Sequence, residues 1–243
     1  MQMQAAWYES NGVASDVLQV GLQPTPQPSA GQVRVKLYCS GVNPSDVKSR
    51  AARPLGGPIV IPHSDGAGVI DAVGEGVKKS RIGQRVWTWN GQWQRPWGTA
   101  AQFICLSDVQ AVQMPESLSF QAGACMGIPG LTALRAVQLA GDVEGKTVLV
   151  TGASSAVGHY VTQMLKRRGA VVIGTVGSDD KALHAKAAGA DHCIFYKTED
   201  AVSQVKLLSD GEGADTIIDM DFSTTIQWMA QGILRPHGHL VCY

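Results

Sequence analysis

The sequence lacks closely spaced cysteines. Its five cysteines lie singly along 243 residues and form no Cys-x-x-Cys pair; they are Cys39, Cys105, Cys125, Cys193 and Cys242. Disulfide frameworks of small secreted domains and four-cysteine zinc sites both need closely spaced cysteines, so neither is predicted. Scattered free cysteines are typical of a reduced intracellular protein, and we expect a cytoplasmic location.

Excess charge and long apolar runs are also missing. Twenty Lys and Arg residues balance twenty Asp and Glu residues, and no basic cluster is longer than residues 166–168. The chain therefore has no electrostatic footprint for nucleic acid. No apolar stretch reaches the roughly 18 residues of a membrane-spanning helix. We expect a globular protein that binds a small molecule, with neither nucleic acid nor a membrane as its partner.

The first 120 residues read as short β-like runs separated by turns. The clearest runs are 5–8, 33–37, 67–73 and 85–89, with prolines at positions 24, 26, 28, 54, 58 and 62 between them. Strands at this spacing predict a β-rich, barrel-like domain over residues 1–120. A helical segment, 119–139, then leads into a second domain, residues 121–243.

From residue 147 onward, strands and helices alternate. The predicted strands are 147–150, 171–175, 192–196, 216–220 and 239–243, and the predicted helices are about 157–168, 180–188, 199–209 and 224–231. Gly169, Gly189 and Gly232 stand where helix-ending glycines are favoured. The alternation predicts an α/β Rossmann-like, doubly wound parallel sheet. Because the dinucleotide-binding sheet has six strands and the sequence stops within a fifth, we expect a C-terminally truncated piece of a longer protein.

The most informative segment is 147–158, Thr-Val-Leu-Val-Thr-Gly-Ala-Ser-Ser-Ala-Val-Gly. A short apolar strand runs through a turn of small residues directly into a helix, which aims backbone N–H groups and the positive end of the helix dipole at one point. That geometry binds a pyrophosphate. The usual Gly-x-Gly-x-x-Gly keeps only Gly158, because Ala153 and Ser155 replace its first two glycines. An ordinary strand-turn-helix unit is the alternative interpretation. The predicted cofactor contacts in this segment are Ser154, Ser155, Ala156, Val157 and Gly158.

Several motifs together resemble the zeta-crystallin-type quinone oxidoreductases of the medium-chain dehydrogenase/reductase superfamily. They are Cys-Ser-Gly-Val-Asn-Pro-Ser-Asp at 39–46, Asp-Gly-Ala-Gly-Val-Ile-Asp-Ala-Val-Gly at 65–74, Gly-Gln-Arg-Val at 83–86, Gly-Ile-Pro-Gly-Leu-Thr-Ala-Leu-Arg-Ala at 127–136, and Ala-Ser-Ser-Ala-Val-Gly at 153–158. The resemblance covers essentially the whole chain. It implies a GroES-like β domain, a dinucleotide-binding domain, NADPH-dependent quinone reduction and a homodimer of the full-length protein.

The cofactor choice rests on the end of the second strand of the dinucleotide-binding domain. An NAD-selecting carboxylate is absent there until Asp179, whereas Ser178, Lys181 and Tyr196 offer a hydroxyl, an ammonium and a phenol for a 2′-phosphate. The resembled family uses Ser, Lys and Tyr at matching positions for NADPH. Asp179 and its acidic neighbour Asp180 place negative charge near the expected 2′-phosphate and so count against NADPH, but NADPH remains the predicted cofactor. Further predicted cofactor contacts, on the nicotinamide side, are Thr132, Cys242 and Tyr243.

Zinc is not expected. The zinc-dependent branch of the superfamily holds its catalytic metal through Cys and His, whereas this chain has Asn43 and Ser64 at the matching positions. Zinc needs thiolate, imidazole or carboxylate ligands that converge tetrahedrally. His63 is one residue out of place, and we interpret it as a packing or hydrogen-bonding histidine.

The predicted catalytic residue is Asn43, whose amide would hold the carbonyl oxygen of an electron-poor acceptor beside the nicotinamide; a turn-capping asparagine is the alternative. Lys48 stands where some relatives carry a substrate-site tyrosine. A tract rich in tryptophan, 87–97, offers flat apolar walls for a ring-shaped substrate. Its predicted pocket residues are Trp87, Trp89 and Trp97.

The leading functional hypothesis is transfer of a hydride or electrons from NADPH to a quinone without metal. An enone or 2-alkenal double-bond reductase would use the same cofactor. A zinc alcohol dehydrogenase and a non-catalytic NADPH-binding protein are the remaining alternatives.

Overall fold

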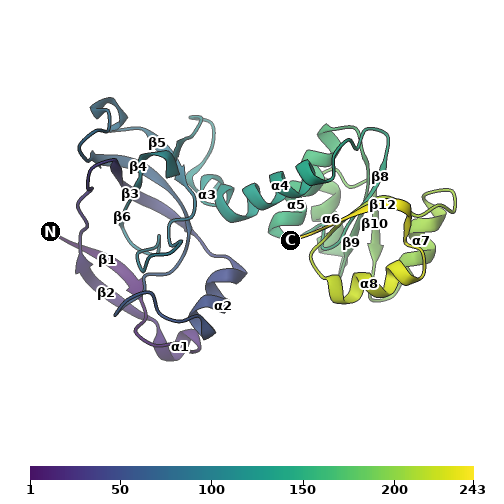
Figure 1. The fold of residues 1–243 in the computed structure, drawn as a ribbon, viewed down its shortest axis with the longest axis horizontal. Coiled ribbons are helices and arrows are strands. Elements are labelled where there is room, and N and C mark those ends of the chain that lie inside the picture. Colours follow the sequence, from purple (N-terminus) through teal and green to yellow (C-terminus); the bar gives the residue numbers. More distant parts are fainter. The chain divides into compact units, whose positions relative to one another are not determined.

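The computed structural model describes residues 1–243, which form two compact units, Met1–Ile128 and Pro129–Tyr243 (Figure 1). The units divide between Ile128 and Pro129, a short distance beyond the predicted boundary at residue 120. None of the helices has both the length and the apolar character that crossing a membrane requires.

The first unit is built on antiparallel strands. Its main sheet has the order β6-β3-β4-β5-β7, and β1 and β2 pair separately. The strands are β1 (Gln2–Trp7), β2 (Gln19–Pro24), β3 (Gln32–Gly41), β4 (Asp65–Val73), β5 (Arg85–Thr88), β6 (Phe103–Ser107) and β7 (Ala111–Gln113). The helices are α1 (Ala14–Val17), α2 (Pro44–Ala52), α3 (Phe120–Gly123) and two 3₁₀ turns, Lys79–Arg81 and Asp108–Gln110. The β-rich prediction is confirmed.

The core of this unit follows from alternation along the strands. Val33 and Val35 on β3 are fully buried, and they pack with Ile70 of β4 and Val86 of β5. Alternate residues of a strand point to opposite faces, so one face of the sheet fills with β-branched side chains.

The helical segment predicted over 119–139 is present, but it is divided into shorter pieces. The structure divides it into α3, a π-helical turn (Met126–Gly130) and α4 (Leu131–Leu139). Pro129 stands inside the π-helical turn, where it cannot donate a backbone hydrogen bond and its ring crowds the preceding turn. The break falls at the division between the two units.

The second unit is a parallel sheet with the strand order β10-β9-β8-β11-β12. Its strands are β8 (Thr147–Val150), β9 (Val171–Val176), β10 (His192–Phe195), β11 (Ala214–Asp219) and β12 (Leu234–Cys242). Its helices beyond α4 are α5 (Ala156–Arg167), α6 (Asp179–Ala187), α7 (Ala201–Leu207) and α8 (Phe222–Ala230). The predicted doubly wound α/β sheet is confirmed.

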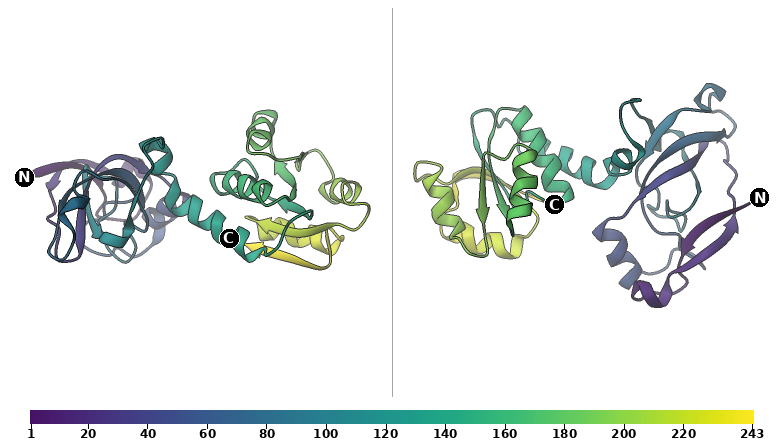
Figure 2. Two further views of the ribbon diagram at one scale, coloured as in Figure 1. Left: turned by 90° about the horizontal axis from the view of Figure 1, so that it is seen from above. Right: turned by 180° about the vertical axis from the view of Figure 1, so that it is seen from behind.

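Helices cover both faces of this sheet (Figure 2). One core cluster joins the sheet to α4, α5 and α6, and a second joins it to α7 and α8. Val148, Leu149 and Val150 of β8 are fully buried because both faces of the central strand are covered. Gly169, Gly189 and Gly232 all adopt positive φ after helices, as predicted.

The strand β12 begins at Leu234, five residues before its predicted start at residue 239. Its pairing with β11 is shifted between Ala214 and Thr216, and His237 has a positive φ of 62°. The Pro-His-Gly sequence at 236–238 is typical of a turn. For that reason the sequence did not predict a strand before residue 239.

The strand order reverses beside β8, between β9 on one side and β11 on the other. Ligands of open parallel sheets bind outside the carboxyl ends of the strands at such a point. The turn at 151–155 leaves the sheet there, which places the predicted pyrophosphate segment at the switch point.

Candidate functional site

The turn after β8 is shaped by two glycines. Gly152 has a positive φ of 61°, and a Cβ on Gly158 would lie 2.2 Å from the carbonyl oxygen of Gly152. Helix α5 begins at Ala156, and its first N–H groups have no intrahelical acceptor. The turn therefore combines close backbone packing with a helix N-terminus, as pyrophosphate binding requires.

Ser155 is the N-cap residue of α5. Its Oγ accepts a hydrogen bond from the N–H of Gly158 at 3.0 Å. The phenol of Tyr243 lies near Ser155; desolvation raises the pKa of this phenol, while the polar Ser155 side chain acts in the opposite direction. The end of β12 thus lies at the turn, with Cys242 exposed beside it.

The buried carboxylate of Asp219 is hydrogen-bonded to the start of the turn that follows β8. Asp219 Oδ1 accepts hydrogen bonds from Thr151 Oγ1 at 2.8 Å and Thr225 Oγ1 at 2.7 Å. Thr151 Oγ1 in turn accepts from the N–H of Met220 at 2.9 Å. These bonds tie the carboxyl ends of β8 and β11 to α8. Sequence reasoning missed Asp219, although a carboxylate directly after the apolar pair Ile217 and Ile218 was a usable signal.

The residues predicted to surround a 2′-phosphate lie at the ends of β9 and β10 and at the start of α6. Ser178 is the exposed N-cap residue of α6 and makes no capping hydrogen bond, and Lys181 is exposed in the first turn. A Cβ added at Gly177 would lie 3.6 Å from Tyr196 Oη and 3.7 Å from Lys197 Cε. The structure therefore brings Tyr196 next to Ser178 and adds Lys197, which sequence reasoning missed although it directly follows Tyr196.

Thr132 lies half-buried on α4. Its role beside the nicotinamide stays a prediction, as do the roles of the other predicted cofactor contacts.

In the first unit, Asn43 joins two elements. It is the N-cap residue of α2, and its backbone N–H donates to Asp46 Oδ2 at 2.7 Å. Its side-chain Nδ2 donates to Asp65 Oδ2 at 2.8 Å. Asn43 therefore stands directly before the helix, while its side-chain amide is directed to the start of β4.

Asp65 is fully buried and only partly satisfied. Its Oδ2 also accepts from the N–H of Ile128 at 2.9 Å, whereas Oδ1 has no hydrogen-bond partner. A Cβ on Gly127 would lie 2.1 Å from Oδ1, so residue 127 has no room for a side chain. Burial raises the pKa of Asp65 to about 6, against the opposing effect of the bonds from Ile128 and Asn43. The sequence analysis included Asp65 in the motif at 65–74 but assigned no role to its side chain.

His63 makes a hydrogen bond within the first unit. Its Nδ1 lies 2.9 Å from Ser40 Oγ, which lies 2.9 Å from Thr99 Oγ1, and Thr99 donates to the carbonyl oxygen of Asp65 at 2.6 Å. Burial lowers the pKa of His63. This short chain of hydroxyl groups connects His63 to the backbone beside the Asn43–Asp65 pair.

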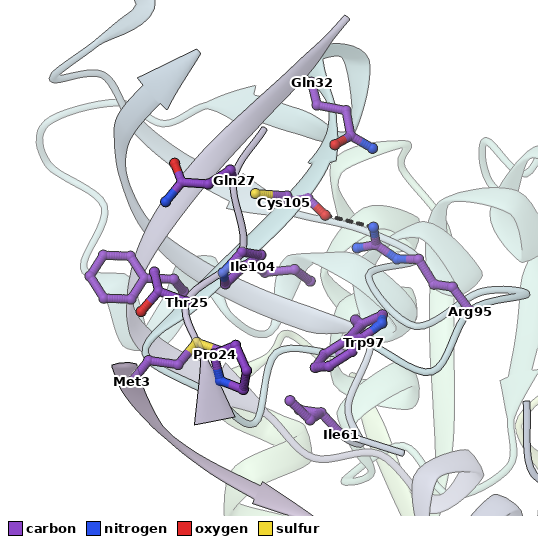
Figure 3. A pocket seen from close by; sticks show the side chains of 13 residues that line it. Met3, Pro24, Thr25, Gln27, Gln32, Ile61, Arg95, Trp97, Ile104 and Cys105 are labelled. Carbon is purple, nitrogen blue, oxygen red and sulfur yellow. Dashed lines mark hydrogen bonds between the residues drawn. The ribbon is translucent and has the colours of Figure 1, made fainter. Parts of the chain in front are cut away.

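The tryptophans predicted as substrate walls do not converge. Trp87 packs against the cluster that contains Met114 and Ala124, and the Trp89 indole donates to the carbonyl oxygen of Val109 at 3.4 Å. Trp97 lines a separate cavity (Figure 3). Lys48 is exposed on α2, whereas Asp46 and Ser49 on that helix are buried. The substrate roles of these residues stay predictions.

Comparison with known proteins agrees with this geometry. The alcohol dehydrogenase GroES-like domain family matches residues 29–116, and the zinc-binding dehydrogenase family matches residues 156–243. Quinone oxidoreductase of Rattus norvegicus is 34% identical over 198 residues, which is 80% of this chain and 59% of that protein. The chain thus spans about three fifths of the length of this relative.

Solved structures give the same result over nearly the full chain. A quinone oxidoreductase of Pseudomonas syringae superposes with a TM-score of 0.88 at 29% identity, covering 99% of this chain and 73% of that one. A mycobacterial protein solved in complex with NADPH superposes with a TM-score of 0.85 at 28% identity, covering 99% of this chain and 74% of that one.

The zinc implied by the description of one matching family does not fit the residues present. Asn43 and Ser64 offer an amide and a hydroxyl in place of thiolate and imidazole, and the Asn43 amide is bonded to Asp65. The two matched families, the order of the two folds and the relatives agree with one another. The chain belongs to the medium-chain dehydrogenase/reductase superfamily, and within it the chain is similar to quinone oxidoreductases.

Proposed function

We propose that this chain is the cofactor-binding and acceptor-binding core of a reductase that uses NADPH to reduce a quinone without zinc. The observation that carries the proposal is the buried amide of Asn43, held by Asp65 at 2.8 Å. The Nδ2 group of asparagine has two N–H bonds, so Asp65 takes one and the other remains for an acceptor. The amide provides a positioned neutral donor where zinc-dependent relatives hold a metal ligand.

The start of α5 is the proposed pyrophosphate site. The N–H groups of Ser154, Ala156 and Val157 and the hydroxyl of Ser155 are the donors. The close packing of Gly158 against Gly152 lets the helix start directly behind the turn. When it is bound, NADPH supplies the hydride.

The preference for NADPH rests on charge at the ends of β9 and β10. Ser178, Lys181 and Tyr196 stand at this edge, and Lys197 adds a second ammonium. An ammonium stabilises a phosphate as a point charge, and the hydroxyl groups donate hydrogen bonds. The NADPH-bound mycobacterial relative supports this choice. Thr132, Cys242 and Tyr243 are proposed to border the nicotinamide.

The acceptor is an electron-poor carbonyl compound. A quinone takes up a hydride and a proton to give a hydroquinone, and negative charge develops on its oxygen during the transfer. The free N–H of Asn43 would stabilise that oxygen, as oxyanion-binding donors do. An enone or 2-alkenal would use the same donor, so the acceptor test includes both classes.

The test measures NADPH oxidation with 1,4-benzoquinone and with an unsaturated ketone. Replacing Asn43 with Ala is expected to lower kcat about a hundredfold, the usual effect of losing one positioned donor, with little change in the Kd of NADPH. Asn90→Gly is the matched control, because Asn90 lies in a loop at a positive φ of 50° that glycine also accepts. Unchanged turnover in Asn43→Ala would refute the proposed role.

Chelation tests the metal-free part of the proposal. Prolonged dialysis against a chelator is expected to leave the rate unchanged. Loss of activity that added zinc restores would show that the reaction uses zinc, whereas NADPH binding without turnover of any acceptor would favour a non-catalytic role.

A further inference from the structure

A cavity of the first unit includes the predicted pocket residue Trp97 but neither Asn43 nor Asp65. Its volume is about 310 Å³, and its walls come from β1, the end of β2, β6 and the segments around Ile61 and Arg95 (Figure 3). Most of the wall is apolar, with Met3, Ile61, Trp97 and Phe103 among the lining side chains. Volumes from about 300 Å³ upward are typical of small-molecule sites.

One cationic side chain lines this apolar cavity. Arg95 donates from Nε to the carbonyl oxygen of Gly91 and from Nη1 to that of Cys105 at 2.6 Å. Its Nη2 is buried and has no hydrogen-bond partner. Two backbone carbonyls therefore fix the guanidinium plane, and the third nitrogen remains available.

No carboxylate neutralises Arg95. The four ion pairs of the structure involve Arg34, Arg81, Lys166 and Arg235. Burial lowers the pKa of the Arg95 guanidinium, but an arginine keeps its charge in proteins. A buried cation with a free donor and no counter-charge is costly unless something else pairs with it.

A second polar atom at the cavity is also unsatisfied. Thr25 Oγ1 is buried without a hydrogen-bond partner. Figure 3 shows Thr25 and Arg95 on opposite sides of the pocket, with Ile104 and Trp97 between them. Buried polar groups nearly always find a partner, and these two groups have none within the protein.

We propose that this cavity binds a small carboxylate with an apolar body. The carboxylate accepts from Arg95 Nη2, and the body lies against Met3, Ile61 and Trp97. Phosphate is disfavoured because only one guanidinium nitrogen is free and the remaining wall is mostly apolar. At about 30 Å³ per non-hydrogen atom, the cavity holds about ten such atoms.

This proposal goes beyond the proposed reductase function, because the ligand needs neither NADPH nor the Asn43 amide. The probes are benzoate and octanoate, which match the cavity in size, and their neutral counterparts benzyl alcohol and octanol. Calorimetry with the 243-residue protein is expected to show saturable binding of the two carboxylates, with the neutral compounds at least tenfold weaker.

Two arginine variants locate the charge. Arg95→Met is expected to weaken carboxylate binding at least tenfold, since it removes the only cation of the cavity. Arg53→Met is the matched control, because Arg53 lines a neighbouring cavity that Arg95 also borders, but does not line this one. Loss of binding in Arg53→Met would place the anion in that neighbouring cavity and overturn the proposal.

A second readout does not depend on the stability of Arg95→Met. Octanoate is expected to shift the NMR signals of the Met3 and Ile61 methyl groups in the wild type. Absence of saturable binding at millimolar carboxylate, equal binding of the neutral probes, or unchanged methyl signals would each overturn the proposal.

Discussion

The side-chain amide of Asn43 donates to Asp65 Oδ2 at 2.8 Å, joining the N-cap residue of α2 to the first residue of β4 across 22 positions of sequence. Asp65 Oδ2 also binds the backbone of Ile128. This single carboxylate oxygen thus orients the proposed catalytic amide, and its partner Oδ1 stays buried without a hydrogen bond.

Replacing Asp65 with Asn is expected to stabilise the protein at neutral pH. The pKa of Asp65 is raised to about 6 in the folded state, from about 4 when unfolded, so the folded state binds more protons between these values. Stability is therefore lost as the pH rises through this window, by about 2–3 kcal/mol in total. The advantage of Asp65→Asn should grow from pH 4 to pH 7.

Urea unfolding at several pH values checks this prediction. Asp16→Asn is the control, because Asp16 is exposed and should give no such trend. A constant difference between Asp65→Asn and the wild type across the window would contradict the buried, proton-binding carboxyl.

Lys181→Ala is expected to reduce the preference for NADPH over NADH. The wild type should bind NADPH at least tenfold more tightly than NADH, because Ser178, Lys181 and Tyr196 replace a carboxylate. The variant should lose most of that ratio while the Kd of NADH stays the same. Lys197→Ala is expected to have a smaller effect of the same kind.

Fluorescence titration with both cofactors provides the measurement. Lys186→Ala is the matched control, because Lys186 lies in the last turn of the same helix. The assignment fails if the wild type binds both cofactors equally or if Lys186→Ala has the same effect as Lys181→Ala.

Ser155→Ala is expected to lower the free energy of unfolding by about 1 kcal/mol, since it removes the hydroxyl that caps the N–H of Gly158. Ser155→Gly should cost only a few tenths of a kcal/mol, because glycine is accepted at N-cap positions. Denaturant titration distinguishes the two. Equal stability of Ser155→Ala and the wild type would show that the cap contributes nothing.

The stacked imidazoles of His159 on α5 and His184 on α6 are expected to make stability fall in acid. Their ring centroids are 4.1 Å apart, and burial, together with His184, lowers the pKa of His159. The unfolded state then binds more protons, so stability is lost as the pH falls below about 6.5. His184→Gln should reduce the loss of stability in acid, measured as the melting temperature at several pH values. A variant whose melting temperature depends on pH as the wild type's does would contradict the proposed effect of the histidine pair.

The organisation of the second unit was predictable because its signals are local. Strand β8 matches its predicted bounds, and the glycines at 169, 189 and 232 end helices at positive φ as expected. Apolar runs and helix-ending residues act over a few neighbours, which a sequence displays directly. In contrast, the pattern over 119–139 did not reveal that the segment divides into α3, a π-helical turn and α4.

By itself, the sequence determined the two-part fold and the turn of small residues between β8 and α5, since each depends on residue types at short spacing. Only the tertiary structure decided that Asn43 bonds to Asp65, that Lys197 joins Tyr196 at Gly177, and that Arg95 stands unpaired in an apolar cavity. These relationships depend on side-chain directions and burial. Chain folding sets both by bringing together elements that are distant in sequence.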